Sequence, residues 1–135
     1  MMNKNIIIIL ILILISLNVK ASNLEIITKG LDFPTMFSIN QNSKNDIFVV
    51  EHFTGNVKLI NLETKDEKLL FSVGKKIGFE GSWEAGLNSA VPSPDFLNDS
   101  TFFINYTDKN YDVIVSKIIL KENKYEEKII LKIER

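Results

Sequence analysis

Few side chains in this sequence could carry out chemistry. The chain contains a single histidine, His52, and no cysteine. The lack of cysteine excludes disulfides, thiol nucleophiles and cysteine-based metal sites. The sequence also shows no Ser/His/Asp set, no glycine-rich phosphate loop and no pair of histidine ligands. His52 directly follows Glu51 at the end of a predicted strand, so we expect a surface or turn histidine.

The segment Asp108–Asp112 has oxygen-bearing side chains at alternate positions, as the first half of an EF-hand calcium loop does. The rest of that pattern is missing. Val113 stands where the loop needs glycine, and Ile119 stands where it needs a bidentate glutamate. We therefore predict a polar hairpin turn here and assign no metal ligand.

Short apolar runs separated by turn residues follow the first part of the chain, and this pattern is typical of β-strands. No segment after residue 21 shows sustained helical periodicity. The predicted strands are at about Leu24–Thr28, Phe37–Asn40, Asp46–Glu51, Asn56–Asn61, Lys68–Val73, Leu87–Val91, Thr101–Thr107, Val113–Leu120 and Glu126–Ile133.

The predicted strands repeat with a period of roughly 55 residues and about four strands per unit, which is the size of a β-propeller blade. The matching pairs are Asn45–Glu51 with Asp99–Asn105, Asn56–Ile60 with Asp112–Ser116, and Glu67–Phe71 with Glu127–Leu131. Two runs, Ile47–Val50 and Phe102–Ile104, are continuously apolar, so we expect both of their faces to be buried. The sequence thus predicts an all-β partial propeller of about two blades, with a small β-sandwich or meander as the alternative.

Two repeat units leave large faces open, because repeat folds bury their core between neighbours. A closed propeller needs about four blades or more. We therefore expect residues 22–135 to be an incomplete propeller domain. The chain would then be the N-terminal part of a longer protein, a truncated gene product or one piece of an assembly.

The first 21 residues resemble a secretory signal peptide. Lys4 precedes an unbroken Ile/Leu run, Ile6–Ile15, and Val19 and Ala21 fit the small-residue cleavage pattern. The apolar core is shorter than the roughly 20 residues that a membrane-spanning helix needs. We predict cleavage after Ala21 and an exported, periplasmic or secreted protein; a retained membrane anchor is the alternative.

Removal of this leader leaves a mildly acidic chain. Of the 16 basic residues, Lys4 and Lys20 lie in the leader, while all 17 acidic residues lie after it, so 14 basic residues remain and the net charge becomes −3. Such a chain has neither the basic surface that binds nucleic acid nor a polybasic patch for anionic lipid. We expect no nucleic-acid partner and no stable membrane association after leader removal.

Several short motifs follow one another in an order that is typical of one protein family. They are Gly30-Leu31-Asp32-Phe33-Pro34, Val49-Val50-Glu51, Gly55-Asn56-Val57, Glu84-Ala85-Gly86-Leu87, Pro94-Asp95-Phe96 and Tyr106-Thr107. Together they resemble the glucose/sorbosone dehydrogenase family of PQQ-dependent soluble aldose sugar dehydrogenases, over nearly all of residues 24–133. Asn88-Ser89 replaces the family's Leu-Gly, and Ser93 replaces its histidine before Pro-Asp.

This resemblance implies a six-bladed propeller with PQQ near its axis, commonly held by calcium, and an aldose sugar as substrate. It implies that a histidine deprotonates the sugar's anomeric hydroxyl while hydride passes to the quinone. Only Glu84 matches a position that faces the cofactor, so it is the candidate cofactor-binding residue; a solvated loop carboxylate is the alternative. The family's base belongs to a His-Asn-Gly-Gly-like segment expected beyond Arg135, so we assign no catalytic residue and expect the 135-residue chain alone to be inactive.

Two other functions remain open. One is a non-catalytic or decayed propeller that serves as a binding module, which the departures at Asn88-Ser89 and Ser93 favour. The other is a calcium-dependent lactonase, which would need Glu, Asn and Asp ligands from several blades.

Overall fold

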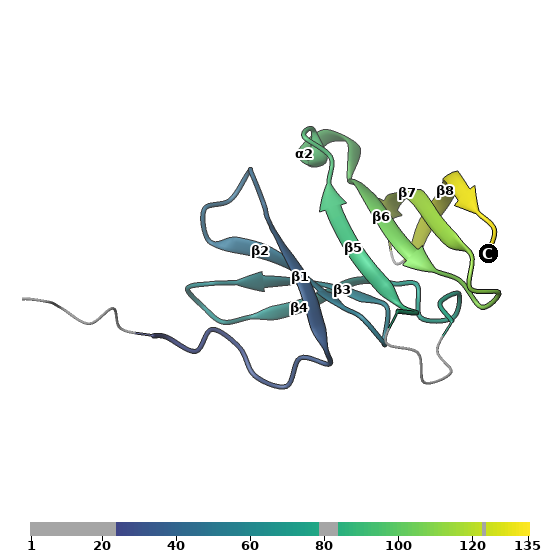
Figure 1. The fold of residues 1–135 in the computed structure, drawn as a ribbon. Helices are drawn as coiled ribbons and strands as arrows, with labels where there is room; N and C mark the ends of the chain where they lie inside the picture. Colours follow the sequence, from purple (N-terminus) through teal and green to yellow (C-terminus); the bar gives the residue numbers. More distant parts are fainter. Residues whose placement is uncertain (1–23, 79–83, 123) are drawn as a thin grey trace, which may run out of the picture.

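Two four-stranded antiparallel sheets make up the computed structural model, which describes residues 24–78, 84–122 and 124–135 (Figure 1). The predicted leader, residues 1–21, lies outside these ranges. The first sheet contains β1 (Pro34–Ile39), β2 (Asp46–Glu51), β3 (Asn56–Asn61) and β4 (Glu67–Ser72). The second contains β5 (Leu87–Pro92), β6 (Thr101–Thr107), β7 (Val113–Lys121) and β8 (Lys124–Ile133), and the one-turn helix α2 (Phe96–Asp99) joins β5 to β6.

Each sheet is a meander in which every strand pairs with the next along the chain. The sheets lie side by side with β5 against β1 and β2, so the first strand of each sheet faces the other (Figure 1). The Ser38 hydroxyl donates to the Ala90 carbonyl across this contact, at 3.2 Å. The arrangement places the ends of β2 and β6 close to the segment that enters β5.

The turn between β2 and β3 requires glycine. Gly55 has φ +66°, and a Cβ atom there would lie 2.7 Å from the Gly74 nitrogen. The close approach lets the Val73 amide donate to the Gly55 carbonyl at 2.9 Å, which fixes the chain as it leaves β4. A side chain at position 55 would therefore be strained by its conformation and obstructed by neighbouring backbone.

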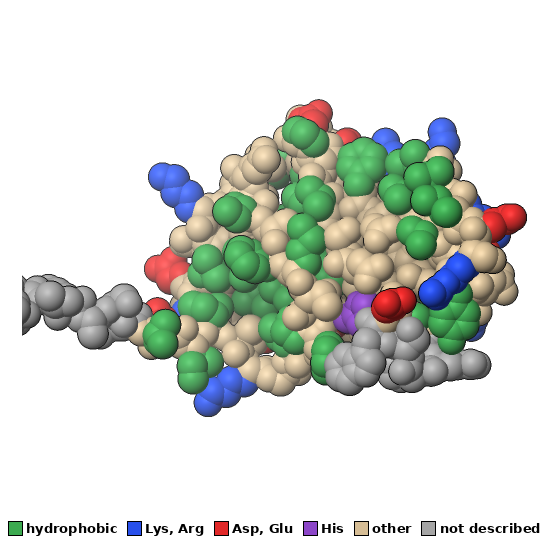
Figure 2. Space-filling view, viewed as in Figure 1, with side chains coloured by type: hydrophobic (Ala, Val, Ile, Leu, Met, Phe, Trp, Pro, Cys, Tyr) green, Lys and Arg blue, Asp and Glu red, His purple; other side chains and the backbone are tan. Residues whose placement is uncertain are grey.

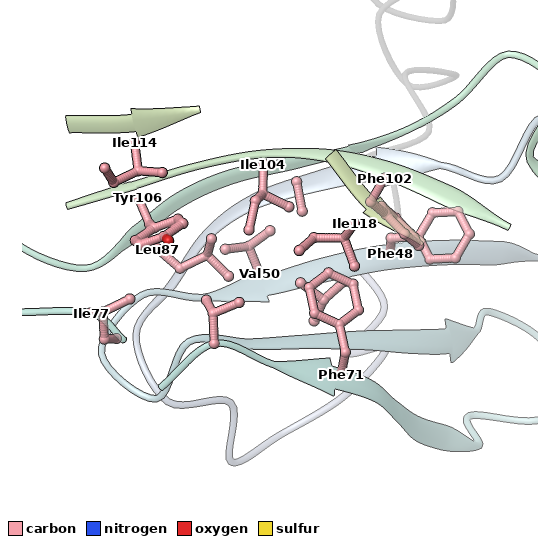
Figure 3. Packing of buried hydrophobic residues seen from close by; sticks show 13 residues of the cluster. Phe48, Val50, Phe71, Ile77, Leu87, Phe102, Ile104, Tyr106, Ile114 and Ile118 are labelled. Atoms are coloured by element: carbon pink, nitrogen blue, oxygen red, sulfur yellow. The ribbon is translucent and has the colours of Figure 1, made fainter. Parts of the chain in front are cut away.

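The hydrophobic core lies between the two sheets (Figure 3). Phe48 of β2 packs edge-on against Phe102 of β6 with ring centroids 4.9 Å apart, and Phe71 of β4 lies 5.4 Å from the same ring. Each fully buried aromatic or aliphatic side chain of this kind contributes about 1.5–3 kcal/mol through removal of apolar surface from water. Inter-sheet packing thus holds together two sheets that share no hydrogen-bonded strand pair in the described residues.

The predicted strands are confirmed from β1 to β8, with small shifts at their ends. The first predicted strand, Leu24–Thr28, is wrong, because this segment has no hydrogen-bonded strand partner. It is held by side chains instead: Thr28 donates to Glu67, and Glu25 pairs with Lys65. The β-propensity of residues 24–28 favours a strand. In the structure, however, β1 pairs with β2, and no described strand pairs with residues 24–28.

The expectation of two buried faces is confirmed for one central strand and wrong for the other. Phe48 and Val49 of β2 point to opposite faces and are both buried. In β6, Phe102 and Ile104 are buried, but Phe103 is 41% exposed. No described element covers its face of the second sheet, whereas Ile27, Thr28 and Leu31 lie over the face of the first sheet that carries Val49.

Candidate functional site

Glu84 lies at the rim of a hollow of about 340 Å³ formed where β5, β6, β7 and the chain end meet. Its backbone carbonyl accepts from the Thr107 hydroxyl at 3.3 Å, and its carboxylate lies 3.9 Å from the Arg135 guanidinium. The side chain is 82% exposed. An exposed ion pair of this length contributes less than about 1 kcal/mol, and the carboxylate faces solvent.

Side-chain amides form the polar wall of this hollow. The Asn88 amide donates to the Asn105 side-chain oxygen at 3.3 Å, and the Asn105 amide donates to the Ile114 carbonyl at 3.2 Å. The remaining lining residues are Thr107, Tyr111, Val113, Ile133 and Glu134. The amide and hydroxyl groups can both donate and accept hydrogen bonds, and the carboxylates accept them, which suits a ligand rich in hydroxyl groups.

The segment that carries Glu84 is fixed by His52. The Leu87 amide donates to the His52 carbonyl at 2.9 Å, and His52 Nδ1 lies 3.1 Å from the Leu87 carbonyl. Because a carbonyl oxygen can only accept, Nδ1 must carry the hydrogen. A Cβ atom on Gly86 would lie 2.7 Å from the His52 ring, so glycine permits this close approach.

The expectation of a turn histidine is confirmed, but the surface placement is wrong. His52 is only 4% exposed, because the chain entering β5 crosses directly over it. Sequence reasoning did not find this contact, since the two segments are more than 30 residues apart. His52 acts here as a positioning residue for the Glu84 segment.

A second polar centre, at the end of β2, surrounds Glu51, which is 2% exposed. Its carboxylate receives hydrogen bonds from the Asp32 amide, the Thr54 hydroxyl and the Asn56 amide, and an ion pair from Lys58 at 2.7 Å. Burial opposes ionisation, but these four donors, Lys58 foremost, lower the pKa of Glu51 to about 2. A carboxylate with all its acceptor sites occupied holds structure together and is not a catalytic base.

A third polar cluster lies between the sheets. The Tyr106 hydroxyl donates to the Glu127 carboxylate at 2.9 Å, and Lys76 pairs with the same carboxylate. Burial, followed by the adjacent Glu127 carboxylate, raises the pKa of Tyr106. For Glu127 burial opposes ionisation, but the Lys76 hydrogen bond and charge lower the pKa. The cluster is a satisfied ion pair that links the two sheets.

The calcium-loop look-alike forms the predicted polar turn. The Asp108 carboxylate accepts from the amides of Asn110 and Asp112, and the Asp112 carboxylate accepts from Lys132 and the Arg135 amide. Their oxygens are therefore engaged by backbone amides of the turn and by groups at the end of β8 and just after it. Among residues 24–78, 84–122 and 124–135, no group of three or more His, Asp or Glu side chains could hold a metal ion.

Comparison with solved structures identifies the architecture. The chain is similar to the PQQ-bound form of aldose sugar dehydrogenase from Streptomyces coelicolor, with a TM-score of 0.67 and 19% identity over 81% of this chain. The chain folds as part of a β-propeller. It spans about a third (33%) of the length of that dehydrogenase chain. No protein-family model and no curated protein matches the sequence.

When the chain is compared with a β-propeller, each of its two sheets corresponds to one blade: β1–β4 form the first blade and β5–β8 form the second blade. Glu84 lies on the connection between the blades, and Asn88 lies on the innermost strand of the second blade. The structure therefore brings Glu84 together with Asn88 and Asn105, and it leaves His52 beneath them. The membrane-anchor alternative falls on residues 1–21, outside the described residues; within the described ones no helix is long and apolar enough to cross a membrane.

Proposed function

We propose that this chain forms the first two blades of an exported quinoprotein oxidoreductase that oxidises aldose sugars by hydride transfer to PQQ. The observation that carries the proposal is the likeness in fold to a PQQ-bound aldose sugar dehydrogenase. The ordered motifs from Gly30 to Thr107 support it. The acidic chain after residue 21 is consistent with a small-molecule substrate and with no nucleic-acid or membrane partner.

The described residues do not form a complete PQQ site. PQQ is a quinone with several carboxylate groups, so it needs more positive charge than Arg135 supplies, and Arg135 is already close to Glu84. Calcium also lacks a ligand set here. We therefore derive no catalytic step through the cofactor, and the proposal places the remaining ligands and the catalytic base on other blades.

Within the proposed function, Glu84 forms one wall of the site. Its exposed carboxylate accepts hydrogen bonds from hydroxyl groups, and the Asn88 and Asn105 amides stand beside it to donate. Negative charge at Glu84 favours contact with sugar hydroxyls and with the quinone edge over contact with the cofactor's carboxylates. His52 contributes by holding the Gly86-Leu87 backbone in place beneath this wall.

The function is tested on the native polypeptide. We expect its denatured mass to be several-fold above 15.4 kDa, with a His-Asn-Gly-Gly-like segment after Arg135, and we expect PQQ-dependent dye reduction with an aldose. The purified 135-residue chain is expected to reduce no dye, because it lacks that segment. A native mass at or below 15.4 kDa would remove the enzyme proposal, and dye reduction by the 135-residue chain would show that the base lies within it.

The position of Glu84 is tested by fluorescence, because the only tryptophan of the chain, Trp83, precedes it directly. We expect added PQQ to quench the tryptophan emission of the native polypeptide saturably. Glu84→Gln removes a negative charge beside an anionic ligand, so we expect about two- to fivefold tighter binding. Glu126→Gln, which removes an exposed carboxylate near the start of β8, at the other end of the strand from Ile133 in the hollow, is the control and should leave the affinity unchanged. Equal affinity in both variants would show that Glu84 does not face the cofactor.

A binding module is the second candidate function. The hollow beside Glu84 combines a carboxylate with two side-chain amides, and none of its lining residues is a histidine. That lining can hold a sugar without oxidising it. Saturable binding of an aldose by the native polypeptide, with no PQQ-dependent turnover, would favour this candidate.

A further inference from the structure

Tyr111 has an unfavourable backbone conformation at the edge of the candidate site. It lies in the turn between β6 and β7, has φ +66°, and lines the hollow that Glu84 borders. This left-handed conformation suits glycine and asparagine, whereas a bulky side chain is uncommon in it. Such a residue persists only where the surrounding structure holds it, and residues of this kind cluster at functional sites.

The turn holds this conformation without help from the Tyr111 side chain. The Tyr111 amide donates to the Asp108 carbonyl at 2.9 Å, and the Asp108 amide donates to the Asp112 carbonyl at 3.0 Å. The Asp108 carboxylate accepts from the amides of Asn110 and Asp112 at 2.8 and 3.0 Å. These contacts use backbone groups and an aspartate, so the turn would form with any residue at position 111 that tolerates a positive φ.

A turn in the first blade shows that a positive φ does not require an aromatic residue. Lys65, between β3 and β4, also has φ +66°, and its amide donates to the Asn61 carbonyl at 2.9 Å. Its flexible side chain forms an ion pair with Glu25. The two positions share the φ angle but differ in residue type. The turn thus explains the positive φ of Tyr111 and leaves its aromatic ring unexplained.

The described part of the fold does not use the Tyr111 ring. Within residues 24–78, 84–122 and 124–135, the phenol makes no hydrogen bond, its ring packs on no other ring, and Tyr111 is outside the hydrophobic core. The other two tyrosines differ in this respect. The Tyr106 hydroxyl donates to Glu127, and the Tyr125 ring packs against Phe71 with centroids 5.7 Å apart. A strained aromatic side chain that the fold does not use is expected to contact a ligand.

The hollow beside Glu84 has apolar lining as well as its amide wall. The apolar lining comes from Tyr111, Val113 and Ile133. Figure 2 shows acidic, basic and hydrophobic side chains at the end of the second blade where Figure 1 places the turn between β6 and β7. A sugar ring combines the same two properties, because hydroxyl groups surround its edge and its faces carry C–H groups that pack on a flat aromatic ring.

The charges around the hollow favour a neutral ligand over an anionic one. Its lining includes the carboxylates of Glu84 and Glu134 and the single guanidinium of Arg135, which sum to 1 − 2 = −1. The neighbouring Lys132 is balanced by Asp112 at 2.9 Å. A net negative lining repels the carboxylates of PQQ and leaves an uncharged sugar unaffected.

We propose that Tyr111 is a substrate-contacting residue whose ring packs against the C–H face of an aldose, while Glu84, Asn88 and Asn105 bind the sugar's hydroxyl groups. This inference rests on the proposed function, which supplies the aldose. The turn gives up some stability to present the ring, a trade-off that is common at functional sites.

The test uses the native polypeptide that contains this chain, titrated calorimetrically with D-glucose, D-galactose and D-xylose. Tyr111→Asn removes the ring and suits a positive φ. We expect it to weaken binding of the best-bound sugar about tenfold, while the urea midpoint stays at or above that of the wild type. Tyr111→Phe keeps the ring and should bind that sugar within about threefold of the wild type. The PQQ affinity, measured by fluorescence quenching, should be unchanged in both variants.

Lys65→Asn is the matched control, because it replaces a residue with the same φ that does not line the hollow. It should leave the sugar affinity unchanged. A lowered urea midpoint in Tyr111→Asn would show that the ring is structural. That result, an unchanged sugar affinity or weakened PQQ binding would each overturn the inference while wild-type turnover remains intact. A wild type that neither binds these sugars nor turns them over would instead remove the proposed function, and the inference with it.

Discussion

Replacing Glu51 with alanine is expected to lower the free energy of unfolding by about 3–5 kcal/mol, the range for removing one partner of a buried ion pair. The substitution leaves Lys58, Asn56 and the Asp32 amide without their shared acceptor at a site where Glu51 is 2% exposed. Urea denaturation followed by circular dichroism measures the loss. The segment before β1 should loosen first, because the Asp32 amide is one of the four donors.

The lowered pKa of the Glu51 carboxylate predicts that the free energy of unfolding depends on pH. Its pKa is lowered from 4.5 to about 2 in the folded chain, so folding favours the ionised form. The stabilisation is therefore fully present above about pH 4.5 and is lost as the pH falls toward 2. Glu51→Gln, which keeps the size of the side chain, should lose this dependence. The stability difference between wild type and Glu51→Gln is thus expected to shrink between pH 6 and pH 2; a constant difference would contradict the assigned network.

The repeat and most strands could be predicted from sequence, because apolar runs and turn residues are local signals. Ile47–Val50 and Phe102–Ile104 identify the central strands, and Gly55 marks the turn that needs a positive φ. The faces of those strands could not be predicted in the same way. A register that differs by one residue reverses every side chain, and only the contact of Phe48 with Phe102 fixes which face is which.

The polar networks depend on distant contacts and were missed. In the sequence Glu51 stands out only as part of the Val49-Val50-Glu51 motif, although Thr54, Asn56 and Lys58 follow at spacings that one β-hairpin brings to a single carboxylate. That spacing is the signal that could have revealed the network. His52 offered no such signal, because its partners Gly86 and Leu87 come from the next blade. The local sequence predicts that His52 lies in a turn, whereas its contacts with the next blade determine that it is buried.

Phe102→Ala is expected to have an effect of similar size on the interface between the blades. Phe102 is fully buried and contacts Phe48, Phe71 and Phe96, with ring centroids 4.9–5.4 Å apart. Its removal takes three aromatic contacts from the core and leaves a cavity, which costs about 3–5 kcal/mol for Phe→Ala. Because the described residues provide no strand pair between the two blades, this packing is the main force that joins them.

The measurement compares Phe102→Ala with Leu97→Ala by urea denaturation. Leu97 is 71% exposed, so its truncation should change the free energy of unfolding by no more than about 0.5 kcal/mol. If the blades depend on each other, Phe102→Ala unfolds both in one transition at lower urea. Two separate transitions, one at the wild-type midpoint, would instead show that a blade is stable by itself.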